Sequence, residues 1–444
     1  MSYALTAIRE SRVQSFFLEA ALSPLKLLHL LVSTPVPLFL LTLTAMLFRP
    51  PDLKAFPVDR VAFFVLVATV AIRICIRREQ IVVYPLTWPL LALLLLGLWG
   101  ALTQPYSAEA WSLFAAKWAV PFVMFHIAGL VFADTHSLDS LESYLLVVLV
   151  YLSVVSILSF VDASGFIFPR FIADESIGIH ADRARGPFLQ AVANGVCLNI
   201  LGLIALDSSR RHKLRGSVAL LLFFSVPLAL LATRTRAVWV SAALSLVYLA
   251  FFGAAPRLRR VAIALSICAG VSALAVFTYQ ANTSSLSERL VDRSPVEFRT
   301  EMYRAGWQMF IEKPLMGWGN EWKVQPEIET RVSSFHPEYY VFHNTFLELA
   351  VERGVLGLGL FVWLFVCLFR LRKWKVRDKA NVPFLSSHFR QLWPVLLAVY
   401  LLNACAVVMN YQFVNALLFT IAGVLATADV KHRTVSSLEA EGAA

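Results

Sequence analysis

The residue best suited to chemistry is His343, which ends a long polar segment and stands directly before an apolar run. Imidazole has a reference pKa of about 6.5, so at neutral pH it can take a proton from a hydroxyl group as a general base. A single histidine is a weak signal, and an interfacial histidine near a helix start is the competing interpretation. Its neighbour Asn344 can orient the imidazole or cap the helix, and its position favours capping.

Two carboxylates follow in the same predicted helix. Glu348 and Glu352 lie four residues apart and share one helix face with Asn344. Ionisable groups inside a membrane helix are costly and belong to functional or structural polar networks. We interpret Glu352 and Arg353 as an internal ion pair, and we leave the role of Glu348 open as a supporting residue.

Three arginines form a second candidate group: Arg185, just before a predicted helix, Arg236, which opens another, and Arg299, early in a loop helix. A guanidinium group stays charged and matches phosphate oxygens with two parallel hydrogen bonds. Arginines from three segments are able to clamp a pyrophosphate. The alternative for each is contact with anionic lipid headgroups, and only convergence in space separates the two interpretations.

A metal site is not expected. The only adjacent acidic pair in the loops predicted to lie on the outer side is Asp174 with Glu175, and there is no histidine or cysteine pair at zinc-ligand spacing. We therefore predict chemistry without metal or cofactor.

The elements that position these residues are membrane helices. The chain has 444 residues, of which 58% are hydrophobic and 15% charged, against about 25% charged in soluble domains. Runs of about 20 apolar residues, enough to cross a bilayer, recur throughout. The sequence predicts an all-α, polytopic membrane bundle of about twelve spanning helices, because backbone groups in lipid must be paired within a helix. We place these at about residues 27–48, 58–76, 82–103, 110–133, 140–162, 187–206, 216–233, 236–253, 260–279, 343–369, 391–409 and 411–428.

Charge then sets the orientation. Arginine and lysine cluster in every second connection except 134–142, as at Arg210 to Arg215 and Arg370 to Lys375, which predicts that these connections and both termini are cytoplasmic. The same clustering argues against nucleic acid as a partner, despite a net charge of +10. Segment 134–142 is acidic but is placed on the cytoplasmic side, since acidic residues weigh little in this rule.

We expect one transmembrane domain over residues 1–444, with a smaller outer loop at 164–186 and a large one at 280–341. Both loops carry arginines that the orientation rule does not require. Residues 297–312 have apolar positions at helical spacing, and Pro314 to Gly319 then turn the chain. A shorter helix is expected at about 285–293.

These residues resemble the O-antigen ligase and polymerase superfamily. The turn that contains Pro314, Gly317 and Gly319 precedes a His343-Asn344 helix start, which is similar to the signature of that family. Three further segments resemble it in order: Arg185-Gly186 with Asn194, Thr235-Arg236 with Trp239, and Arg299 with Trp307.

The resemblance implies a metal-independent, inverting glycosyltransferase of the bacterial inner membrane. Such ligases transfer a polysaccharide from undecaprenyl pyrophosphate to the lipid A-core oligosaccharide at the periplasmic face, with membrane lipids around them. His343 would then be the general base, and Arg185, Arg236 and Arg299 would hold the pyrophosphate.

Three alternatives remain open. An O-antigen polymerase and an O-linked protein oligosaccharyltransferase belong to the same superfamily and differ in the acceptor, and the single large loop favours a ligase. A transporter of polyprenyl-linked glycan is the non-enzyme alternative. The sequence shows neither the paired repeats nor the matching broken helices typical of transporters.

Overall fold

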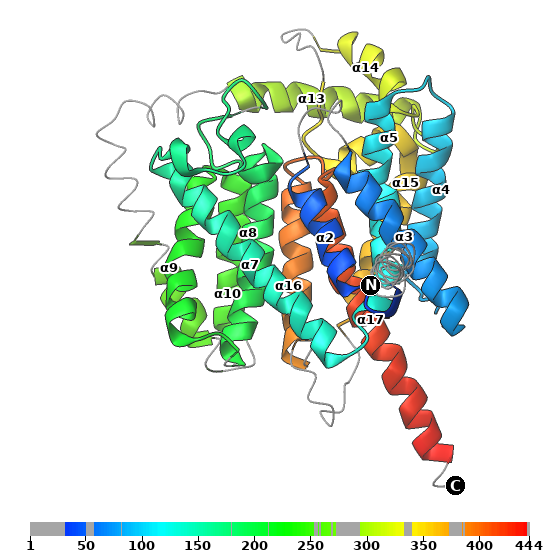
Figure 1. Ribbon diagram of the computed structural model, residues 1–444. Helices are drawn as coiled ribbons and strands as arrows, with labels where there is room; N and C mark the ends of the chain where they lie inside the picture. Colours follow the sequence, from blue (N-terminus) through cyan, green and yellow to red (C-terminus); the bar gives the residue numbers. More distant parts are fainter. Residues whose placement is uncertain are drawn as a thin grey trace, which may run out of the picture.

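The computed structural model describes a helical protein, and the described part contains no strand (Figure 1). This confirms the all-α prediction. The described residues are 32–49, 57–80, 82–178, 180–211, 213–252, 256, 259–267, 270–271, 294–332, 340–372, 384 and 387–441. The predicted helix at 285–293, and parts of the predicted spans 27–48 and 260–279, lie outside them.

The helices follow the apolar runs closely. Their bounds are α2 (Val36–Leu47), α3 (Val58–Arg77), α4 (Thr87–Leu102), α5 (Ala108–Phe114), the π-helical turn η1 (Ala115–Ala119), α6 (Val120–Val131), α7 (Thr135–Phe160), α8 (Ala191–Arg210), α9 (Gly216–Ala232), α10 (Arg236–Phe252), α13 (Ser294–Glu312), α14 (Glu321–Glu329), α15 (Thr345–Arg370), α16 (Ser387–Ala404) and α17 (Gln412–Glu441).

Four of these helices are long and apolar enough to cross a membrane: the continuous helix Ala108–Val131, α7, α8 and α15. Several others, such as α4, α9 and α10, are apolar but shorter. Large apolar side chains are exposed on the outside of the bundle, among them Phe64, Trp99 and Phe251, which suits a surface in contact with lipid rather than water. The full count of twelve spans stays a prediction.

One end of the bundle is covered by a helix that lies across it. Figure 1 shows α7, α8, α9 and α10 on one side, α3, α4, α5 and α15 on the other, and α16 between them. Helix α13 runs crosswise over this end, with α14 beside it. Met302, Ala305 and Met309 of α13 are buried, as the helical spacing in residues 297–312 predicts.

The acidic segment 134–142 lies at the same end of the bundle as the basic segment after α8. Lys213 Nζ is 2.8 Å from Asp139 Oδ1, and Arg211 forms an ion pair with the buried Glu142. Two of the acidic residues in this segment, Asp139 and Glu142, are therefore paired with neighbouring basic residues. Placing both segments on one side of the membrane is consistent with these contacts.

Helix α15 is interrupted at Gly354, where φ is +62°. The large loop fills the break: Val355 N donates to Pro314 O at 2.7 Å, while Trp318 N donates to Val351 O at 2.8 Å. Gly319 N donates to Glu352 O at 3.0 Å. The backbone groups of α15 that lose their helical partners at the break therefore form hydrogen bonds with the turn at Pro314 to Gly319. Such pairing is required because unpaired backbone groups are costly when they are buried or face lipid.

We expect Gly354→Ala to destabilise the protein. A β-carbon there would lie 2.4 Å from backbone atoms of Leu315, and the positive φ adds strain of about 1–3 kcal/mol for a residue other than glycine. The matched control is Gly359→Ala on the same helix, where a β-carbon meets nothing within 4 Å. Thermal unfolding in detergent should show a lower Tm for Gly354→Ala than for the wild type, and no decrease in Tm for Gly359→Ala. Equal Tm values would mean that the loop does not need this close approach.

Candidate active site

His343 lies at the junction of the large loop and α15, two residues before the first helical residue. Its φ is +52°, in the left-handed region, so it precedes the helix instead of opening it. Asn344 is the N-cap: its Oδ1 accepts from Phe346 N at 2.9 Å and Leu347 N at 3.1 Å. The capping role expected for Asn344 is therefore confirmed.

Contacts from two other segments fix this junction. Thr345 Oγ1 donates to Val407 O at 2.9 Å and accepts from Met409 N at 3.0 Å, which ties the helix start to the connection between α16 and α17. That connection begins after Ala404, so the predicted span 391–409 was too long at its end. Tyr303 of α13 donates to the carbonyl oxygen of His343 at 3.5 Å.

The surroundings of the imidazole favour its neutral form. Partial burial lowers the pKa of His343 below its ordinary value, and the positive charge of Arg299 and the proximity of His180 lower it further. The ring of Phe298 lies edge-on, with centroids 6.2 Å apart. A neutral imidazole at neutral pH is the form that accepts a proton.

Arg299 and His343 therefore belong to one electrostatic environment, although they are 44 positions apart in the sequence. Arg299 is on α13 and its side chain is exposed. His180 brings in a third segment, the smaller outer loop 164–186. The convergence of all three candidate arginines on His343 stays a prediction.

Arg236 is the first residue of α10, and its side chain is exposed. The turn before it is joined to the smaller loop by Ala184 N donating to Ala232 O at 3.1 Å. One and a half turns further along α10, Ser241 accepts from Asn403 near the end of α16 at 3.0 Å. Arg236 consequently lies at the same end of the bundle as α13, and its contact with a ligand at His343 stays a prediction.

Arg185 has a different environment from the other two arginines. Its side chain is 3% exposed, and its guanidinium donates to the carbonyl oxygens of Ile177 at 2.5 Å, Asp174 at 2.9 Å and Ile172 at 3.0 Å. These bonds hold the smaller loop together. Both terminal nitrogens of Arg185 are already used by its own loop, so its structural role here is the better supported one.

Glu348 is buried on α15, and its Oε2 lies 3.0 Å from Lys117 Nζ. Lys117 belongs to η1, a π-helical turn that interrupts the helix between α5 and α6. The neighbouring carbonyl of Ala116 accepts from Asn415 Nδ2 at 2.9 Å. Glu348 and Lys117 therefore form an ion pair that joins α15 to η1.

The expected ion pair between Glu352 and Arg353 is not formed in this described region, so that prediction was wrong. Arg353 donates to Asn320 Oδ1 instead. Consecutive helical residues point in different directions, and side chains three or four positions apart are the ones that meet.

Three residues of the site were missed in the sequence. His180 lies in the smaller outer loop and Tyr303 between Arg299 and Trp307, and nothing in their local pattern sets them apart. Lys117 did carry a signal, because it is a charged residue within a long apolar run. Within the described part of the chain, no group of three or more histidine, cysteine or acidic residues is placed to hold a metal ion.

In a comparison with known families, residues 217–362 fit a family model described as O-antigen ligase. The matched segment runs from α9 into α15 and contains Arg236, Arg299 and His343, whereas Arg185 precedes it. No curated protein matches the chain.

Proposed function

We propose that this chain, whose residues 217–362 match a family model described as O-antigen ligase, is an O-antigen ligase with His343 as general base. It transfers a polysaccharide from undecaprenyl pyrophosphate to the lipid A-core oligosaccharide at the periplasmic face of the bacterial inner membrane. The observation that carries the proposal is the partly buried His343, whose pKa is lowered by burial and by Arg299.

The chemistry requires little beyond a base and a positive site. A glycosyl pyrophosphate is already activated, and its departure leaves negative charge on phosphate oxygens. Preorganised donors that meet this charge as it develops stabilise the transition state. Arg299 and Arg236 are our candidates for this contact, while Arg185 holds the smaller loop that carries His180.

His343 removes the proton of the acceptor hydroxyl as that oxygen attacks the anomeric carbon. The pyrophosphate leaves from the opposite face, so the configuration is inverted. Base catalysis of this type contributes about 10²–10⁴-fold to the rate. The reaction as proposed has no step that needs a metal ion.

The test is a transfer assay with purified protein, polyprenyl-pyrophosphate-linked glycan and lipid A-core, in the presence of EDTA. We expect a glycan-extended lipid A-core. Elongation of the donor glycan itself would instead identify a polymerase, and glycan on an added acceptor protein would identify the protein-directed relative. Binding of the donor without transfer to any acceptor would favour a transporter.

The rate should depend on pH in a defined direction. A base with a lowered pKa is mostly neutral at pH 7, so kcat/KM should rise from acidic pH with a midpoint below the ordinary imidazole pKa of about 6.5. In Arg299→Gln the removal of a positive charge should move this rise to higher pH, in addition to slowing the reaction. A pH profile that is the same in both proteins would show that Arg299 does not act on the base.

A further inference from the structure

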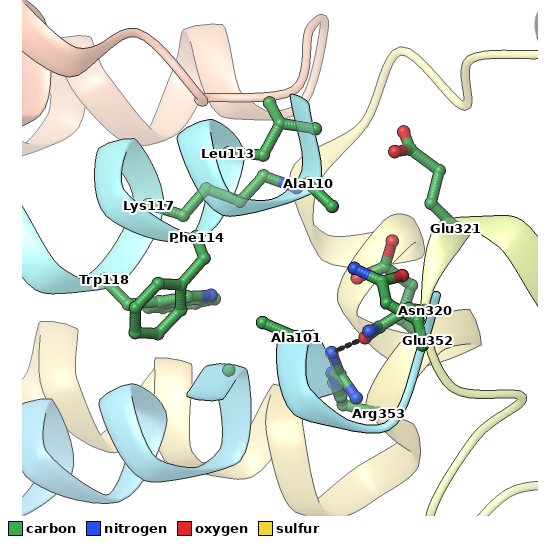
Figure 2. A pocket seen from close by; sticks show the side chains of 12 residues that line it. Ala101, Ala110, Leu113, Phe114, Lys117, Trp118, Asn320, Glu321, Glu352 and Arg353 are labelled. Atoms are coloured by element: carbon green, nitrogen blue, oxygen red, sulfur yellow. Dashed lines mark hydrogen bonds between the residues drawn. The ribbon is translucent and has the colours of Figure 1, made fainter. Parts of the chain in front are cut away.

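A polar hollow lies between α4, the α5–η1 helix, α14 and the middle of α15. Figure 2 shows Lys117 and Trp118 on one side, with Glu321, Glu352 and Arg353 on the other. Its empty volume is about 460 Å³ when the open mouth is included.

The side chains that line the hollow leave hydrogen-bonding capacity facing into it. The carboxylates of Glu321 and Glu352 accept no hydrogen bond within the described part of the chain, whereas Arg353 and Lys117 each use one donor and keep others. Burial and the neighbouring Glu352 raise the pKa of Glu321 to about 7. That carboxyl group is able to donate as well as accept near neutral pH.

Charge narrows the class of ligand. An anion would meet Glu352, and a cation would meet Lys117 and Arg353, so a neutral group fits better than either. Trp118 adds an aromatic ring, which packs so closely on Gly97 that a β-carbon there would lie 2.5 Å from it. Mixed donors and acceptors around an aromatic ring are complementary to a polyhydroxylated ring.

The hollow is also joined to the base by one helix. Glu352 is seven residues after Thr345, the first residue of α15, a separation of about 10 Å at the helical rise, and His343 lies two residues before Thr345. Glu348 lies between them on the Glu352 face and pairs with Lys117 of the hollow. The turn at Pro314 to Gly319 leads directly into Asn320 and Glu321, so the large loop contributes one wall.

We propose that this hollow is a sugar-binding subsite, which holds one ring of a glycan substrate while another ring of that substrate reacts at His343. The proposal rests on the proposed function and deepens it by naming the residues that select a substrate. The glycan is that of either the donor or the acceptor, and both present the same hydroxyl chemistry.

The test compares Glu352→Gln and Glu321→Gln with wild-type protein, and uses Glu329→Gln as the matched control. Glu329 lies on α14 like Glu321 but is exposed and outside the hollow. In the transfer assay we expect each pocket variant to raise KM about tenfold, the effect of losing one hydrogen bond to a charged group, with kcat nearly unchanged.

A rise in KM for the acceptor alone assigns the acceptor glycan to the hollow, and a rise in KM for the donor alone assigns the donor glycan. Unchanged KM values, equal rises in both, or a loss confined to kcat would overturn the proposal.

Binding without turnover separates this proposal from the proposed function. Saturation-transfer NMR is run with core oligosaccharide freed from lipid A and with the free repeat-unit oligosaccharide. Binding by wild-type protein that weakens in Glu352→Gln, but not in Glu329→Gln, supports the subsite even where no transfer occurs, and only the ligase assignment then fails. Transfer by the wild type, with KM and oligosaccharide binding both unchanged in the pocket variants, overturns the subsite alone.

Discussion

His343→Ala is expected to lower kcat for glycan transfer by about 10²–10⁴-fold, the contribution of a general base. Folded protein should still be recovered from the membrane, because the side chain of His343 is only partly buried and Asn344 caps α15 without it. The measurement is single-turnover transfer with saturating donor and acceptor, so that a change in substrate binding does not hide the loss.

Two further variants isolate the imidazole. The backbone at His343 has φ of +52°, which alanine tolerates poorly and asparagine better, so His343→Asn removes the base with less strain. His136→Ala serves as the control, because His136 is exposed near the start of α7, away from the site. Full activity in well-folded His343→Ala and His343→Asn would remove the base assignment.

Arg299→Lys is expected to lower kcat by about 10²–10³-fold, similar to the loss of one preorganised donor at a developing charge. Lysine keeps the positive charge but not the planar pair of donors that matches two phosphate oxygens. Arg304→Lys is the matched control, since Arg304 is exposed on the same helix α13. Both proteins are compared by kcat with the pyrophosphate-linked donor at saturation.

The outcome distinguishes a clamp from simple attraction. If Arg299→Lys behaves like Arg304→Lys, the charge alone matters and bidentate geometry plays no part. If Arg299→Lys is slow while Arg299→Ala is no slower, the guanidinium geometry accounts for the whole contribution of the residue. A lipid-headgroup role for Arg299 predicts little effect on kcat from either substitution.

The sequence by itself determined the helical class and most helix positions, and it supplied the residues of the proposed site. Long apolar runs require helices, because backbone groups in lipid need partners within the same segment. The capping role of Asn344 and the turn at Pro314 to Gly319 were equally predictable. They depend on the local backbone preferences of asparagine, proline and glycine, which act over a few residues.

Only the tertiary structure decided which hydrogen-bond and ion-pair partners the polar side chains have. Arg185 binds three carbonyl oxygens of its own loop, Lys117 reaches Glu348, and Arg353 reaches Asn320. Each of these contacts depends on groups that the fold brings together from distant positions in the sequence, or on a local backbone conformation such as the π-helical turn at Lys117. The sequence shows which residues are charged, but which of them pair follows from the relative placement of α13, α15 and η1.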